Sequence, residues 1–137
     1  MSELEEQLKR HEGFVSHAYQ CPAGFWTIGY GRLIDERRGG GITKEEALHL
    51  LRNDMRRVEM ALSRRVTYWD DLPPRKRQAL LNMAFQLGVD GLMGFRRMWA
   101  AIARRDWDAA AREALDSRWA RQTPRRAEEI AGMLRDG

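Results

Sequence analysis

The feature that most constrains the fold is an apolar segment set between two prolines and a glycine. Pro73 and Pro74 suit the first turn of a helix, and Gly88 suits its end. The helix predicted between them carries apolar side chains nearly all round: Ala79, Leu80, Leu81, Met83, Ala84, Phe85 and Leu87. Because such a helix is stable only when other elements surround it, we expect it at the buried centre of a bundle.

Helices are predicted on both sides of this segment. Ser2 and Glu5 have the spacing of a capping box and Gly13 follows, so a first helix is expected over residues 2–12. After the central segment, the spacing of apolar residues predicts three shorter helices, at about 95–104, 107–116 and 124–134. The chain is therefore expected to be mainly helical.

A second long helix is predicted before the central one. Thr43 is a good N-cap, Glu46 completes another capping box, and the apolar spacing continues to about residue 65. Some 20 residues at 1.5 Å each make a helix of ~30 Å. In a chain of 137 residues, a helix of this length can join two lobes.

Residues 17–30 have the composition of a β-hairpin instead. Pro22 and Gly24 supply a turn between β-favouring residues, and Gly29 and Gly31 indicate a bend or a close approach to the backbone. The sequence thus predicts an α+β fold in a single domain, 1–137. Its parts are a small lobe at about 13–45, a connecting helix at about 43–65, and a helical lobe at about 66–137 that includes helix 2–12.

The net charge of the chain is modestly positive. It has 24 basic and 20 acidic side chains, a balance of +4. A positive excess suits a polyanion, so nucleic acid, an anionic membrane and the acidic cell wall all qualify. Cys21 is the only cysteine, which excludes an intramolecular disulfide. The acidic, polar start predicts no signal peptide, and no apolar run approaches the ~18 residues of a membrane span.

Glu12, Cys21 and Thr27 are the candidates for chemistry. They come from three local structures, namely a helix end, a hairpin turn and the returning strand. A hairpin that folds back on the helix end brings all three to one cleft. Glycoside hydrolysis needs such a set, because a carboxylic acid protonates the leaving oxygen while a second group activates or positions water. From the residues alone, a solvated Glu12 without a catalytic role is an open alternative.

The segment HEGFVSHAYQCPAGFWTIGYG, residues 11–31, resembles the catalytic signature of the phage-type lysozymes, the family of the T-even bacteriophage lysozyme. Their pattern is a Glu, eight residues, an Asp or Cys, five residues and a Thr. Glu12, Cys21 and Thr27 have this spacing. Further segments resemble the same family in the same order, so that the resemblance covers nearly the whole chain: NMAFQLG at 82–88, GF at 94–95, RRDWDAAA at 104–111 and SRWARQTPRRA at 117–127.

The resemblance implies an endolysin-type lysozyme that cuts the β-1,4 bond between N-acetylmuramic acid and N-acetylglucosamine in bacterial peptidoglycan. It implies that Glu12 is the general acid and that Thr27 holds the attacking water. It also places four residues in or near the sugar cleft, namely Leu33, Phe85, Gln86 and Trp119. It places Arg126 so that it faces the catalytic Glu. The three histidines have no metal-ligand spacing with Cys21. We expect no metal and no cofactor.

Cys21 is the main departure from the T-even enzyme, which has Asp at the matching position. A thiol of ordinary pKa, about 8.5, is mostly protonated at neutral pH and is a poor base unless its surroundings lower that pKa. A thiolate is also a strong nucleophile, so a covalent step is one alternative. A turn residue without a catalytic part is another. Water attack aided by Cys21 and Thr27 is the mechanism we favour.

Three other functions compete with hydrolysis. A catalytically silent wall-binding module is one, and Cys21 in place of Asp is the feature that permits it. A basic nucleic-acid binder is opposed by arginine pairs that are spread along the chain. Cleavage without water, leaving an anhydro sugar, is opposed by Thr27. We expect a monomer that binds peptidoglycan, binds no nucleic acid, does not insert stably into a membrane, is made in a host cytoplasm and acts on the wall after release into the periplasm.

Overall fold

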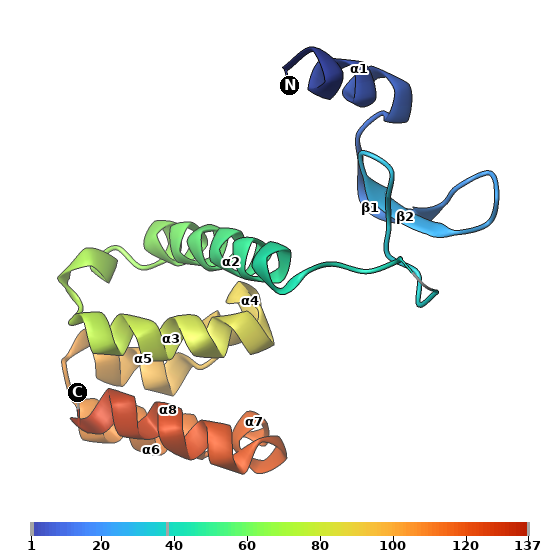
Figure 1. The fold of residues 1–137 in the computed structure, drawn as a ribbon. Coiled ribbons are helices and arrows are strands. Elements are labelled where there is room, and N and C mark those ends of the chain that lie inside the picture. The colour runs from blue at the N-terminus through green and yellow to red at the C-terminus, as the bar shows by residue number, and fades with distance from the viewer. Residues whose placement is uncertain (1, 38, 137) are drawn as a thin grey trace. The chain divides into compact units, whose positions relative to one another are not determined.

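The computed structural model describes residues 2–37 and 39–136 of the chain (Figure 1). It divides into two compact units, Met1–Leu50 and Leu51–Gly137, and the division falls inside a long helix. The first helix is part of the first unit. The sequence assigned helix 2–12 to the helical lobe, and that assignment stays a prediction, as do the lobe boundaries. Within the described residues, no helix is both long enough and apolar enough to span a membrane.

The first unit holds one helix, a small sheet and the beginning of the long helix. Its elements are α1 (Ser2–Glu12), β1 (Val15–Gln20), β2 (Trp26–Gly29), β3 (Arg32–Leu33) and the first turns of α2 (Lys44–Arg65). The sheet is antiparallel with the order β1-β2-β3. The predicted helix and hairpin are confirmed, and β3 is an additional strand. The cap expected at Ser2 concerns a side chain outside the described part of the chain.

The register of the sheet determines which side chains share a face. Thr27 of β2 is paired with Tyr19 of β1 and with Leu33 of β3. Directly paired residues on neighbouring strands point to the same side of a sheet, so these three side chains lie in a row. The register between β1 and β2 shifts between Val15 and Tyr19, and this irregularity marks a bulge in β1.

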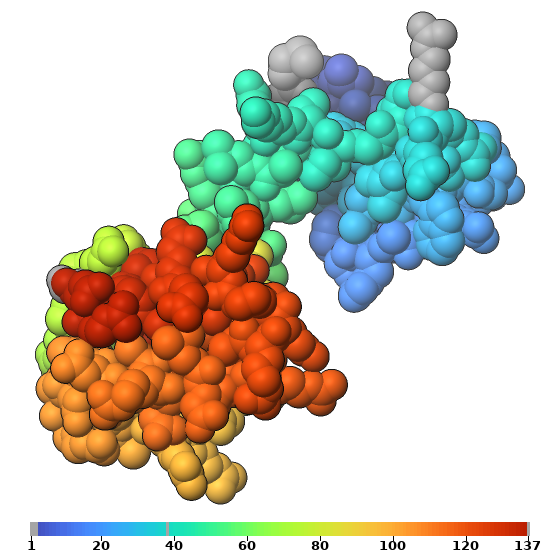
Figure 2. Space-filling model, turned by 90° about the horizontal axis from the view of Figure 1, so that it is seen from below, coloured from blue at the N-terminus to red at the C-terminus, as the bar shows by residue number. Residues whose placement is uncertain are grey.

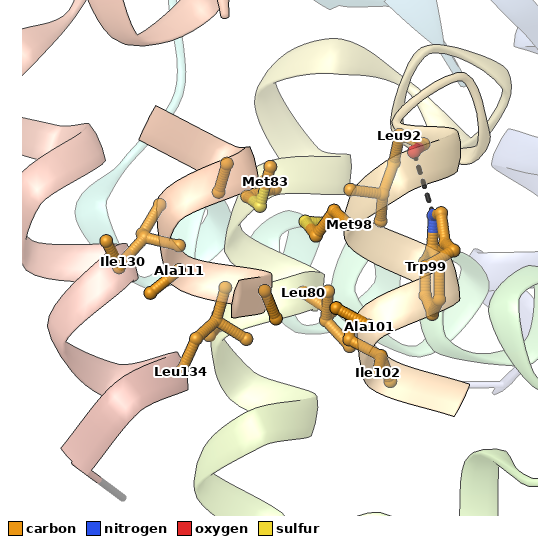
Figure 3. Close-up of a cluster of buried hydrophobic side chains, with 14 of the residues drawn as sticks. Leu80, Met83, Leu92, Met98, Trp99, Ala101, Ile102, Ala111, Ile130 and Leu134 are labelled. Atoms are coloured by element: carbon orange, nitrogen blue, oxygen red, sulfur yellow. Dashed lines mark hydrogen bonds between the residues drawn. The ribbon is translucent and has the colours of Figure 1, made fainter. Parts of the chain in front are cut away.

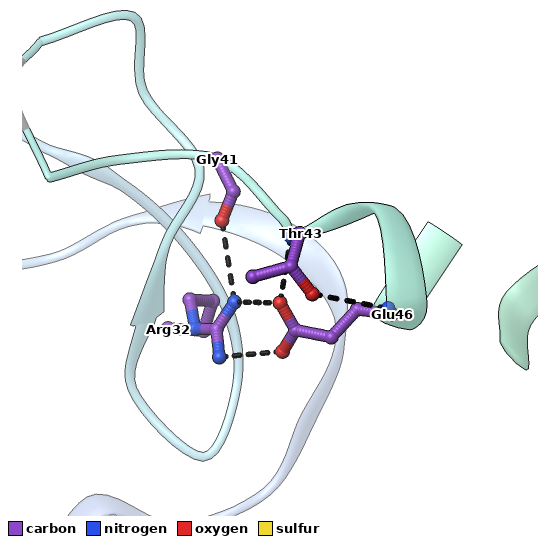
Figure 4. A network of polar contacts seen from close by, with 4 residues as sticks. All are labelled: Arg32, Gly41, Thr43 and Glu46. Carbon is purple, nitrogen blue, oxygen red and sulfur yellow. Dashed lines mark hydrogen bonds and ion pairs between the residues drawn. The ribbon is translucent and has the colours of Figure 1, made fainter. Parts of the chain in front are cut away.

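The capping box predicted at the start of α2 is confirmed (Figure 4). The Thr43 N–H donates to Glu46 Oε1 at 2.8 Å, and the Glu46 N–H donates to Thr43 Oγ1 at 3.1 Å. Arg32 pairs with both carboxylate oxygens of Glu46, at 2.7 and 2.5 Å, and also donates to the carbonyl of Gly41 at 3.3 Å. Hydrogen bonding to Arg32 lowers the pKa of Glu46 to about 2. The network ties the last strand to the helix within this unit.

The second unit is a helical bundle. It consists of the rest of α2 and the elements η1 (Trp69–Asp71), α3 (Pro74–Leu87), α4 (Val89–Met93), α5 (Arg96–Ala103), α6 (Trp107–Leu115), α7 (Arg118–Gln122) and α8 (Pro124–Asp136). Helix α8 packs against α3, α6 and α7, and α6 packs against α5. Figure 2 shows α8, in red, beside the orange segment of α5 and α6. The bundle agrees with the helical part of the predicted α+β fold.

The core of this bundle is made by one broad face of α3 and the helices that cover it (Figure 3). Leu80 and Met83 of α3 are fully buried with Met98 of α5 and Ile130 of α8. The one polar atom of the Trp99 ring also has a partner, because its Nε1–H donates to the carbonyl of Leu92 at 3.0 Å. A buried polar group without such a partner would cost about 1–3 kcal/mol.

The central helix α3 is not enclosed on all sides, and in this respect the sequence prediction was wrong. Phe85 is 44% exposed, and Asn82 and Gln86 on the same side of the helix are exposed as well. The physical reason is that other helices pack on only one side of α3. Asn82 and Gln86 are polar and, being four residues apart, lie together on the other side. The apolar content of a helix predicts that it packs against neighbours, but not how many of its sides they cover.

Candidate active site

Glu12 is the last residue of α1, and its carboxylate lies against the backbone of Gly31. A Cβ at residue 31 would stand 2.7 Å from Glu12 Oε2, so a side chain there would displace the carboxylate. Gly31 also has φ +79, a conformation that favours glycine. The close approach to the backbone that the sequence indicated near Gly31 is therefore found, and the group that approaches is the predicted acid.

Cys21 lies in the turn between β1 and β2, surrounded by backbone N–H groups. Its own N–H donates to the carbonyl of Phe25 at 2.8 Å, and its carbonyl accepts from the N–H of Gly24 at 2.7 Å. The N–H of Phe25 lowers the pKa of the Cys21 thiol below its ordinary value, with smaller help from the N–H groups of Ala23 and Gly24, while burial opposes the change. The turn therefore favours the thiolate, the form that can act as a base or nucleophile.

Thr27 is the only buried polar side chain among the described residues of the first unit, with 3% exposed. Its hydroxyl donates to the carbonyl of Phe25 at 3.0 Å. Since a hydroxyl has one proton and two lone pairs, this bond leaves the oxygen free to accept a hydrogen bond. Leu33 lies directly opposite Thr27 in the sheet. The structure thus places Leu33, Thr27 and the Cys21 turn in one small sheet.

In the second unit, Gln86 of α3 and Trp119 of α7 form a direct pair. Trp119 Nε1 donates to Gln86 Oε1 at 2.8 Å, and the rings of Trp119 and Phe95 pack edge-to-face with centroids 6.1 Å apart. Trp119 is only 5% exposed, so it offers little ring surface to a ligand. The bond instead fixes the amide of Gln86, whose NH₂ group is left to donate outward.

Arg126 and Phe85 line a small groove of ≈ 280 Å³ between α2 and α3, whose apolar side is formed by Leu51, Met55, Val58 and Leu81. Arg126 donates from Nε to Asn82 Oδ1 at 2.9 Å and from a terminal nitrogen to the Asn82 carbonyl at 3.2 Å. These bonds fasten α8 to α3. Arg126 and Glu12 belong to different units, so the expectation that Arg126 faces Glu12 stays a prediction.

The sequence was compared with known proteins. Residues 9–135 match the family described as phage lysozyme. The chain belongs to the phage lysozyme family. The resemblance seen in residues 11–31 is thereby confirmed, and with it the class of enzyme, because the lysozymes of this family are glycoside hydrolases whose substrate is peptidoglycan.

Relatives of this phage lysozyme family member come from phages and from an amoeba. The pre-baseplate central spike protein Gp5 of Enterobacteria phage T4 is 31% identical over 98% of this chain, which spans only 28% of the length of Gp5. The probable T4-type lysozyme 1 of Dictyostelium discoideum is 26% identical over 100% of this chain and 96% of its own. An endolysin of Acyrthosiphon pisum secondary endosymbiont phage 1 is 35% identical over 60% of this chain and 55% of its own.

The structure adds residues that the sequence analysis did not single out. Asn82 holds Arg126, and Phe95 supports Trp119. Both residues lie in segments that resemble the family, and this resemblance was the sequence signal that could have pointed to them. Phe25 also lies in a segment that resembles the family, residues 11–31, but its side-chain type gave no signal, because its contribution comes from backbone groups that hold the Cys21 turn.

Proposed function

We propose that this family member hydrolyses the β-1,4 bond between N-acetylmuramic acid and N-acetylglucosamine, with Glu12 as the general acid. The observation that carries the proposal is that the carboxylate of Glu12 lies against Gly31, four residues beyond Thr27 in the same unit. The Glu–Cys–Thr spacing of the family supports it. In this reaction Glu12 gives its proton to the glycosidic oxygen as that oxygen leaves.

Water attack completes the reaction in the mechanism we favour. The Thr27 hydroxyl donates its hydrogen bond to the carbonyl of Phe25, so its oxygen accepts a hydrogen bond from the water and orients it. Cys21, whose pKa is lowered by the N–H of Phe25, takes the proton that the water loses. A direct attack of the Cys21 thiolate on the sugar is the covalent alternative.

Four further residues are proposed to bind the glycan, and Trp119 to position one of them. Leu33 lies beside Thr27, so it is near the proposed water. Gln86 offers an amide NH₂ held in place by Trp119, which suits a sugar hydroxyl or an acetamido oxygen. Phe85 offers an exposed ring, and Arg126 a guanidinium fixed by Asn82. We further propose that the protein acts as a monomer and that it acts on the wall after release into the periplasm; a relative named endolysin supports the action on the wall.

Replacing Glu12 by Gln tests the assignment of the acid. Glu12→Gln keeps the shape of the side chain and removes its acidic proton, so the rate should fall by about 10²–10⁴. Release of dye-labelled fragments from purified peptidoglycan measures the rate. Glu3→Gln, an exposed substitution in the same helix, is the matched control and should keep the wild-type rate.

A wall-binding module without catalysis is the second candidate, and Cys21 at the position of a carboxylate favours it. Under that function, the wild-type protein and Glu12→Gln bind sedimented peptidoglycan equally and neither releases fragments. Circular dichroism melting of each variant shows whether a loss of rate reflects unfolding. Retention of most activity by a folded Glu12→Gln variant would exclude Glu12 as the acid.

A further inference from the structure

Cys21 and Thr27 are both bound to one backbone carbonyl, that of Phe25. This carbonyl accepts the N–H of Cys21 at 2.8 Å and the hydroxyl of Thr27 at 3.0 Å. The N–H of Phe25 also lowers the pKa of the Cys21 thiol. The position of the Phe25 backbone therefore determines how the two side chains that we propose to handle the attacking water are placed.

The side chain of Phe25 is held from the loop that follows β3. The guanidinium carbon of Arg37 lies over the Phe25 ring, 3.7 Å from its centre, in a cation–π contact. Asp35 binds this guanidinium with both carboxylate oxygens, accepting from Nε at 2.8 Å and from a terminal nitrogen at 3.0 Å. Two parallel bonds of this kind fix the orientation of a planar guanidinium group. The Phe25 ring therefore packs against a cation that cannot turn freely.

Asp35 also acts on the backbone next to Phe25. Its side chain is only 14% exposed. Hydrogen bonding to Arg37 lowers the pKa of Asp35, and the backbone N–H of Trp26 contributes to the same change, while burial opposes it. The N–H of Trp26 and the carbonyl of Phe25 belong to one planar peptide group. Asp35 thus holds the same peptide group that binds the two water-handling side chains.

We propose that Asp35 and Arg37 are positioning residues for the reaction, a clamp that holds the ring and the peptide group of Phe25. Through Phe25, the clamp orients Cys21 and Thr27 toward the attacking water. Neither residue of the clamp touches the glycan or the water in this account. The inference rests on the proposed function, because it takes Cys21 and Thr27 as the groups that handle the water.

The pH dependence of iodoacetamide alkylation of Cys21 in the full chain tests the clamp without any substrate. Two explanations of the role of Asp35 predict opposite results for Asp35→Asn. If Asp35 acted only through the field of its charge, removal of that negative charge would favour the thiolate. If the clamp holds the turn, its loss moves the N–H of Phe25 away from the thiol. We then expect about threefold less thiolate at pH 7, equivalent to about half a pH unit.

Two further variants separate the clamp from a general effect of charge. Glu36→Gln is the matched control, because it removes an exposed acid next to Asp35 and leaves the clamp in place, so the thiolate fraction should not fall. Arg37→Lys keeps the positive charge but lacks the planar fork that Asp35 binds, so the thiolate fraction should fall. An unchanged or larger thiolate fraction in Asp35→Asn would overturn the inference. If Asp35→Asn does not fold, the same result in Arg37→Lys would overturn it.

Kinetics on soluble peptidoglycan fragments show whether the clamp serves the reaction. Because the clamp does not touch the glycan, Asp35→Asn and Arg37→Lys should lower kcat by about three- to tenfold and leave KM nearly unchanged. A wild-type kcat in both variants would remove the clamp from the mechanism. A wild-type protein that releases no fragments would instead overturn the proposed function, and the alkylation measurements would still decide whether the clamp holds the turn.

Discussion

The two units of the molecule differ in what holds them together. In the second unit, side chains such as Leu80, Met98 and Ile130 are almost completely buried. Among the described residues of the first unit, Thr27 alone is buried, and apolar side chains such as Leu8 and Leu48 are 43–46% exposed. The first unit relies instead on sheet pairing, caps and the Arg32–Glu46 pair.

The difference between the units separates the catalytic candidates from the glycan-binding residues proposed on α3 and α7. Glu12, Cys21 and Thr27 belong to the unit with few buried apolar contacts, and segments of that kind open most readily. Phe85, Gln86 and Trp119 project from, or pack on, a helix whose other face is fully buried. Cys21 and Thr27 therefore depend on local hydrogen bonds for their geometry, and the glycan-binding residues proposed on α3 and α7 depend on the core.

The largest expected effect is on the core. Leu80→Ala should lower the free energy of unfolding by about 2–5 kcal/mol, because it removes buried methyl groups and leaves a cavity. Leu48→Ala, at a side chain 43% exposed in the first unit, should change it by less than about 0.5 kcal/mol. Urea unfolding followed by circular dichroism measures both. Equal losses would show that the two units do not differ in this way.

A smaller effect is expected at Cys21, where the first unit depends on local bonds. Cys21→Ser should reduce the rate of wall hydrolysis by about tenfold or more, since a serine hydroxyl is a much weaker base, whereas Cys21→Asp restores a carboxylate and should reduce it less. The wild-type rate should rise with pH as the thiol ionises, with a midpoint below the ordinary pKa of a cysteine thiol.

The order of the two Cys21 variants separates the mechanisms. A lower rate for Cys21→Asp than for Cys21→Ser would show that the thiol itself is required, as a nucleophile would be. Wild-type rates in both variants would make Cys21 a turn residue without a catalytic part. The pH dependence of iodoacetamide alkylation gives the thiol pKa independently of activity.

The smallest effect is expected from the Arg32–Glu46 network. The pKa of Glu46 is lowered to about 2, so the stability that this carboxylate contributes is fully present above about pH 4.5 and is lost as the pH falls toward 2. Melting temperatures measured between pH 2 and 6 should show this loss for the wild type and a flatter profile for Glu46→Gln. The same profile for both proteins would mean that the pair stabilises nothing.

Much of the fold could be predicted because its boundaries rest on local chemistry. Thr43 with Glu46, and Pro74 with Gly88, mark helix ends through bonds or backbone angles that the residues themselves determine. Strand β3 and the five-residue helices α4 and α7 were not predicted. Elements this short carry little periodicity, and neighbouring segments decide their conformation. The exposure of Phe85 did not follow from the apolar pattern of α3, because that pattern does not show how many sides of the helix its neighbours cover.

The candidate site was predictable in its residues more than in its geometry. The spacing of Glu12, Cys21 and Thr27 was visible in the sequence, and Gly31 indicated a close approach without showing what approaches. The hydrogen bond from Trp119 to Gln86 joins residues 33 positions apart. Such contacts depend on how helices pack, which the pattern along one chain does not encode.

The central claim is hydrolysis of the muramic acid bond, and mass spectrometry of fragments from purified peptidoglycan tests it most directly. Treatment with the wild-type protein should release disaccharide-peptides with intact reducing muramic acid ends, and treatment with Glu12→Gln should release almost none. Anhydro ends would contradict hydrolysis and show cleavage without water. Wild-type protein that stays bound to the wall and releases no fragments would contradict catalysis altogether.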